Sequence, residues 1–180
     1  YISNKKTWGE DEWRYCRRPD DLERYHLDYR MILCRVGGLD TGYFSHDAVK
    51  GLDSRAAILL NDLCTIATNL NYNTTHMCRA DSFDWAVKGA KDFEYRDVNG
   101  TLKVLFSVRA YLNGNLHIKF SSKFLMRLNV EFGRLKGWLK TAKEAADELD
   151  IPASDAVESF ESNLQLANDS LLKLGVDLVV

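Results

Sequence analysis

The residues best suited to chemistry in this 180-residue sequence lie around His117. If the segment folds as a hairpin followed by a helix, its layout is that of a ββα-metal nuclease, with His117 as the general base and Asn129 as a metal ligand. Metal-assisted phosphodiester cleavage needs a hard cation held by oxygen ligands. Glu131 is the one carboxylate between positions 103 and 143, which argues against such a centre. The alternative is structural, with His117 pairing with Tyr111 across one face of a sheet.

Signatures of other enzyme classes are missing from the sequence. It contains no phosphate-binding P-loop, no G-x-S-x-G nucleophile turn, no H-E-x-x-H zinc motif and no glycine-rich dinucleotide loop. The four cysteines form no C-x-x-C pair, and His76 with Cys78 supplies too few ligands for zinc. We therefore expect no intrinsic catalysis, no metal and no cofactor, and we keep the metal-dependent nuclease as a minor alternative.

Basic residues are concentrated in positions 103–143, which hold nine lysines and arginines against a single acid. We call this segment, with its net charge of +8, the basic belt. Cations of this kind bind nucleic-acid phosphates, and Tyr111 or Trp138 is suited to stacking on an unpaired base. The residues that we expect to bind nucleic acid are Lys103, Arg109, Tyr111, His117, Lys119, Arg127, Arg134, Lys136 and Lys140.

The segment that follows reverses the charge. Positions 144–180 contain nine acidic residues and one basic residue, Lys173, for a net charge of −8. This acidic end can fold back and neutralise the belt, or it can face outward while the belt binds nucleic acid. A further hypothesis is a protein-binding inhibitor or adaptor, with contacts from the acidic end and from the aromatic N-terminal stretch. Of these functions, nucleic-acid binding is the one that we prefer.

Local patterns predict helices both before and after a small sheet in the sequence. Residues 1–20 are expected to form an arm, and Pro19 to begin a helix that reaches about residue 35, although 31–36 fits a strand equally well. Further helices are predicted at 54–70, at 82–91 with Phe83 and Val87 inward, at 123–133 with Phe124, Leu128 and Phe132 inward, at 141–149 after a Thr141–Glu144 capping box, and at 154–174. The last helix carries a heptad-like apolar stripe, which is suited to a homodimeric coiled coil. Because the stripe spans under three full heptads, we expect it to pack on the domain instead.

The first of two Asn-Gly pairs, Asn99-Gly100, predicts a hairpin with a two-residue turn. This turn pairs Phe93 with Phe106 and Tyr95 with Val104, which places apolar side chains on one face.

The second hairpin is predicted to have a three-residue loop, Asn113–Asn115, with Asn115 in the left-handed conformation. A two-residue loop would mix core and solvent residues on each face, and a slip of one residue inverts a whole strand. The preferred register pairs Leu112 with Leu116, Ala110 with Ile118 and Val108 with Phe120, and it places Arg109, Tyr111, His117 and Lys119 on the polar face.

Together these elements predict one α+β domain. A three-stranded antiparallel meander at 92–121 lies between helical parts at 21–91 and 122–180, and the helices pack against one face of the sheet. The apolar runs are far shorter than the ~20 residues of a membrane span. Without a signal peptide or a disulfide pattern, we expect a cytoplasmic protein.

The hairpin and the segment after it resemble a known family. The string Val108-Arg-Ala-Tyr-Leu-Asn-Gly-Asn-Leu-His-Ile-Lys-Phe120 is followed by Leu125–Asn129 and Gly133–Leu139. It is similar to a bacterial and phage domain-of-unknown-function family that has an N-G-N-L-H box in a hairpin and a Leu-Asn pair in the next helix. Members occur alone in mobile elements or fused behind S-adenosylmethionine-dependent methyltransferases.

The resemblance covers roughly residues 100–149 and transfers no catalytic residue. It implies an accessory domain of a phage or other mobile element in a bacterial host. The expected setting is DNA modification or evasion of host defence, with nucleic acid or a host defence protein as the partner.

Overall fold

The computed structural model describes residues 2–3, 27–41 and 49–161, and it has the α+β composition that the sequence predicts. The strands are β1 (Ile2–Ser3), β2 (Arg30–Leu33), β3 (Leu39–Asp40), β4 (Gly51–Leu52), β5 (Lys91–Arg96), β6 (Leu102–Ala110) and β7 (Leu116–Phe120). The helices are α1 (Ser54–Asn69), the short 3₁₀ helix η2 (Ala80–Ser82), α2 (Ser122–Leu135), α3 (Ala142–Leu149) and α4 (Ala153–Glu161). Most of the predicted arm, the predicted helix start at Pro19 and the C-terminal helix beyond Glu161 lie outside the described residues.

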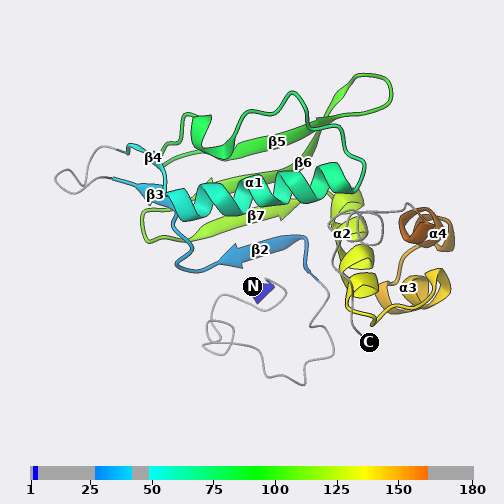
Figure 1. The fold of residues 1–180 in the computed structure, drawn as a ribbon. Helices are drawn as coiled ribbons and strands as arrows, with labels where there is room; N and C mark the ends of the chain where they lie inside the picture. The colour runs from blue at the N-terminus through cyan, green and yellow to red at the C-terminus, as the bar shows by residue number, and fades with distance from the viewer. Residues whose placement is uncertain (1, 4–26, 42–48, 162–180) are drawn as a thin grey trace, which may run out of the picture.

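Among the described residues the main sheet has five strands in the order β1-β2-β7-β6-β5, and every neighbouring pair is antiparallel (Figure 1). It is larger than the predicted three-stranded sheet because β2 pairs with β7, Arg30 opposite Lys119 and Leu33 opposite Leu116. The segment 31–36 fitted a helix or a strand in the sequence analysis, and its first three residues belong to strand β2. The predicted helix is wrong between residues 29 and 35.

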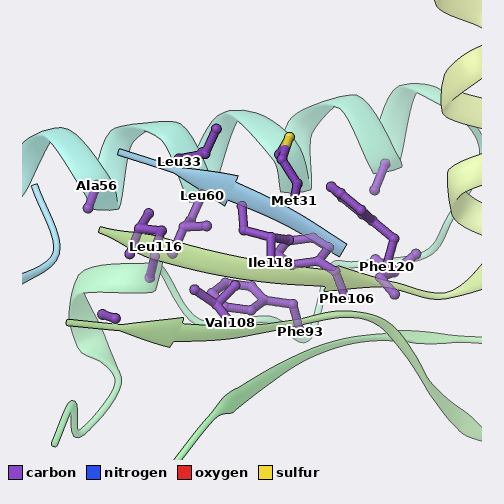
Figure 2. Packing of buried hydrophobic residues seen from close by; sticks show 14 of the residues in the cluster. Met31, Leu33, Ala56, Leu60, Phe93, Phe106, Val108, Leu116, Ile118 and Phe120 are labelled. Carbon is purple, nitrogen blue, oxygen red and sulfur yellow. The ribbon is translucent and has the colours of Figure 1, made fainter. Parts of the chain in front are cut away.

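Helix α1 lies along one face of the sheet and closes the core (Figure 1). The side chain of Asp53 caps this helix by accepting the Arg55 N–H. Figure 2 shows Ala56 and Leu60 of α1 above the inward side chains of the strands. The strand residues that point toward α1 are fully buried, namely Met31, Phe93, Phe106, Val108, Leu116, Ile118 and Phe120, so this face of the sheet is the core face.

Both hairpins close with the same three-residue turn. This length was predicted for the second hairpin, whereas the two-residue turn predicted for the first is wrong. Each loop has three residues: Gly100 N–H donates to the Asp97 carbonyl and Gly114 N–H to the Tyr111 carbonyl, at N···O distances of 2.9 and 3.2 Å. Glycine then takes the left-handed position, with φ of 79° at Gly100 and 82° at Gly114. This type I turn followed by a left-handed residue is the common three-residue hairpin loop, and a left-handed Gly carries no Cβ penalty.

The second loop is therefore 112–114 and not 113–115, and the strand pairing moves by two residues. Ala110 lies opposite Leu116 and Val108 opposite Ile118. Since a shift of two preserves the side-chain alternation, the predicted facing of these residues is correct although the pairs are wrong. Leu112, expected in the core, lies in the turn and is 51% exposed.

In the first hairpin a β-bulge keeps the apolar residues of β6 on the core side although the loop is one residue longer than predicted. Phe93 lies opposite Phe106 as predicted, but after the bulge Glu94 pairs with Val104, and Tyr95 with Lys103 instead of Val104. A three-residue loop alone would turn the inward residues of β6 outward, and the extra residue in the bulge restores them. The bulge therefore shifts the alternation along β6. Between the loop and the bulge the odd-numbered residue Lys103 faces the α1 side, whereas beyond the bulge the even-numbered residues Phe106 and Val108 do.

The helices after the sheet form a smaller cluster. Helix α4 packs on α2 and α3 around Val130, Leu139 and Ala145. The predicted capping box is present in part, since Thr141 Oγ1 accepts the Glu144 N–H at 3.1 Å. Two predicted details are wrong. Phe132, expected to point inward, is 39% exposed, and the helix predicted at 82–91 is absent, since only the short 3₁₀ helix Ala80–Ser82 forms there.

No helix within the described ranges is both long enough and apolar enough to cross a membrane.

The second hairpin loop is held by the segment that leaves β2. Val36 N–H donates to the Gly114 carbonyl and Leu39 N–H to the Tyr111 carbonyl, at 2.9 and 3.1 Å. Gly38 has a φ of 72°, and a Cβ at this position would collide with the Tyr111 carbonyl oxygen. This close backbone approach fixes the end of the sheet at which Tyr111 lies.

We predict that Gly38→Ala destabilises the protein much more than Gly100→Ala. Both glycines have a left-handed φ, which costs an L-residue about 1–2 kcal/mol, but a Cβ at Gly100 would meet no atom within 4 Å. Gly38→Ala adds a backbone collision, so its loss of unfolding free energy should be at least twice that of Gly100→Ala. Urea denaturation of both variants measures the difference, and equal losses would contradict the packing that we describe.

Candidate nucleic-acid interface

The face of the sheet opposite α1 carries two rows of polar side chains. In the first row Arg30, Lys119, Ser107 and Asp92 lie side by side from β2 to β5. In the second row Arg109 lies opposite His117. We call this the outer face, and Arg30, Arg109 and Lys119 its cationic cluster, because these three side chains are exposed.

The cationic cluster brings like charges together. Arg30 lies directly opposite Lys119, and Arg109 is one row further along the neighbouring strand. Directly opposite residues have Cβ atoms about 4.5–5.5 Å apart, and like charges in such pairs are destabilising. Within the described ranges no carboxylate forms a salt bridge with these three residues. The fold thus holds three cations together without an internal counter-ion among the residues described.

Two tyrosines accompany the cations. Tyr111 Oη lies 3.3 Å from His117 Nδ1, with 4.4 Å between the ring centroids, and Arg109 Cζ is 5.3 Å from the Tyr111 ring centroid. The predicted contact between Tyr111 and His117 is therefore confirmed, whereas the predicted register is wrong because Arg109 and not Tyr111 lies directly opposite His117. Near the start of β2, Lys119 Nζ lies 5.1 Å from the ring centroid of Tyr29, which is 47% exposed.

The outer face is not uniformly basic or uniformly open. On β5 it carries Asp92, which accepts a hydrogen bond from Ser107 Oγ, and Glu94. On β2, Ile32 shares this face and is buried, with 1% exposed. The cationic cluster thus occupies the strip formed by β2, β7 and the end of β6, whereas Arg96, on β5 near the first hairpin loop, donates to the Gly100 carbonyl at 3.1 Å.

The electrostatic environment of His117 reflects this strip. Partial burial lowers the pKa of His117 below its ordinary 6.5, and the positive charges of Arg30 and Arg109 lower it further. The imidazole is therefore neutral at pH 7, and a bound anion would raise its pKa by offsetting the two arginines.

The bulge removes Lys103 from the outer face. Lys103 lies opposite Tyr95, whose ring packs against Tyr72 in the core, so both residues point to the α1 side. Its ammonium group lies 2.8 Å from Asp97 Oδ2, and this contact lowers the pKa of Asp97. Asp97 Oδ1 also accepts the backbone N–H groups of Asn99 and Thr101, so Lys103 supports the first hairpin turn.

The predicted basic residues of α2 have partners elsewhere. The Arg127 guanidinium donates to the Leu70 carbonyl and to Glu158 of α4, at 3.0 and 2.8 Å, and its side chain is 11% exposed. Arg134 makes two hydrogen bonds to the buried Glu131 at 2.7 and 2.9 Å. Glu158 shows that the acidic segment neutralises part of the belt, as the alternative hypothesis stated, but this occurs on α2 and not on the outer face.

The remaining predicted positions lie around the end of α2. Lys136 is exposed, and its ammonium group lies 5.7 Å from the Phe132 ring centroid. The Trp138 ring lies 5.7 Å from Phe132, edge to face. Lys140 is exposed and its backbone N–H donates to Glu144. The basic belt is therefore divided between the outer face and a separate helical surface.

The residues proposed for a metal centre do not assemble into one. Asn129 is buried, and its amide binds the backbone of Leu27 twice, at 2.9 and 3.1 Å. No group of three or more potential His, Cys, Asp or Glu ligands occurs in the part of the chain that the structure describes. Asn129 thus anchors the chain that enters β2.

Two residues of the outer face were missed by the sequence analysis. Both residues, Tyr29 and Arg30, lie in the segment for which a helix from Pro19 to about residue 35 was predicted. Their place beside Lys119 depends on pairing between β2 and β7, almost 90 positions apart. Arg30 is followed by three apolar residues, Met31–Leu33, so this segment carries no polar–apolar alternation that would have indicated a half-exposed strand.

Comparison with known protein families, curated proteins and solved structures finds no match to this chain.

We predict that His117 titrates below pH 6.5 and that Arg109→Ala raises its pKa toward 6.5, because one of the repelling charges is removed. A folded-state pKa below the unfolded one stabilises the protein at pH above 6.5, and this contribution is lost as the pH falls through the lowered pKa. NMR titration of the imidazole gives the pKa, and His117→Gln should abolish this part of the pH dependence of stability. A wild-type pKa at or above 6.5 would contradict the electrostatics described.

Proposed function

We propose that the chain binds nucleic acid through the cationic cluster of the outer face. The observation that carries the proposal is the direct opposition of Arg30 and Lys119, with Arg109 beside them and no ion pair to a carboxylate of the described ranges. An anion bound between these side chains would relieve their repulsion, and closely spaced phosphates match closely spaced cations.

Phosphate binding explains features that the fold itself does not require. A buried cation such as Arg127 contributes to packing between helices, whereas the three cations of the outer face contact no other element of the described chain through hydrogen bonds. Phosphate contacts give affinity without reading sequence. We accordingly propose binding that depends little on sequence.

We also propose the biological setting that the family resemblance implies, which is DNA modification or evasion of host defence in a mobile element. Binding to a host defence protein is the competing interpretation. Charge–charge contacts with phosphates release condensed counter-ions, so salt dependence separates the two.

We predict that affinity for a labelled oligonucleotide falls steeply with salt. Three phosphate contacts give a slope of log K against log salt of about −2 to −3. Arg109→Ala and Lys119→Ala should each reduce the slope by about one. Lys136→Ala, an exposed cation of α2, is the matched control and should leave it unchanged. Fluorescence anisotropy across a salt series measures all four proteins, and binding indifferent to salt would favour a protein partner.

We also predict that charge reversal at Arg30 separates binding from stability. Arg30→Glu places a carboxylate opposite Lys119, which should stabilise the fold by a few tenths to about 1 kcal/mol at low salt while weakening nucleic-acid binding. Lys123→Glu is the control, because Lys123 lies 4.0 Å from Glu158 and its reversal creates repulsion. The melting temperature should be higher than that of the wild type for Arg30→Glu and lower for Lys123→Glu. A fall for both would show that the cluster carries no repulsion.

A further inference from the structure

We infer that the ligand of the outer face is a single-stranded nucleic acid, a conclusion that rests on the proposed function and narrows it. Tyr29 and Tyr111 accompany the cations at the two ends of the cationic strip. Aromatic rings bind unstacked bases, whereas the bases of a duplex are stacked on one another and present only their edges.

The width of the outer face also favours a single strand over a duplex. Neighbouring strands lie about 4.8 Å apart, so β2, β7, β6 and β5 together span about 14 Å before their side chains are counted. The major groove of B-DNA is about 12 Å wide and admits a helix or a two-stranded ribbon. A sheet of this width cannot enter the major groove, so an undistorted B-form duplex would contact the outer face mainly through its phosphates.

The position of the tyrosines suits a strand that runs along β7. Tyr111 contacts His117, and Tyr29 contacts Lys119, two residues further along the same strand. Two residues of a strand cover about 7 Å, so a base at each tyrosine would place the intervening backbone over His117 and Lys119, between Arg30 and Arg109. The carboxylates of Asp92 and Glu94 on β5 repel the backbone and limit this path on one side.

The test compares a single strand of about 12 nucleotides, within the ~4–16 that a single-strand-binding domain covers, with a blunt duplex of the same sequence. The single strand should bind at least tenfold more tightly. Tyr29→Leu should weaken single-strand binding by about tenfold, the effect of losing one base stack, and leave duplex binding unchanged. Tyr29→Phe keeps the ring and is the matched control that should bind like the wild type.

Each outcome bears on a distinct claim. Salt-dependent binding of duplex and single strand with equal affinity, or full single-strand affinity in Tyr29→Leu, overturns the inference and leaves the proposed function standing. Absence of salt-dependent binding to either probe overturns the proposed function as well. Circular dichroism melting of each variant confirms that a loss of binding comes from a folded protein.

Discussion

The alternation of side chains along β6 and β7 is the constraint on which the rest of the structure depends. Every second residue from Phe106 to Ala110 and from Leu116 to Phe120 is buried on the α1 side. Burying a large apolar side chain is worth about 1.5–3 kcal/mol, so a slip of one residue would cost far more than any turn or surface charge could return. The three-residue loops and the bulge between Phe93 and Glu94 are adjustments that keep this alternation.

The same constraint creates the outer face. With the apolar residues fixed inward, Arg109, His117 and Lys119 must point outward, and pairing with β2 adds Arg30 next to Lys119. The repulsion in this cluster is therefore tolerated because the core determines the register. Energies of a few tenths of a kcal/mol between exposed charges cannot compete with the core, which leaves this face available to specialise for an anionic ligand.

The sequence predicted what depends on local chemistry and missed what depends on distant pairing. Helix α1 with its Asp53 cap, the Thr141 cap of α3, and the facing of Ala110 and Ile118 follow from residues close together in the chain. The loop type could not be predicted from the local sequence, because Asn-Gly suits both a two-residue turn and the left-handed end of a three-residue loop. From the predicted site, Arg109, Tyr111, His117 and Lys119 share a face, whereas the bulge diverts Lys103 and tertiary contacts bury Arg127.

The N-G-N-L-H box illustrates how one motif divides between folding and function. Asn113 Oδ1 accepts the Asn115 N–H, Asn115 Oδ1 accepts the Arg35 N–H, and Gly114 supplies the left-handed turn. Leu116 is fully buried in the core. Four of the five positions are thus occupied in closing the hairpin, holding it against the chain that leaves β2 and filling the core. His117 alone belongs to the outer face, where Tyr111 orients it between Arg30 and Arg109. The box therefore builds the edge of the proposed interface, and the residues that would contact a ligand lie on either side of it.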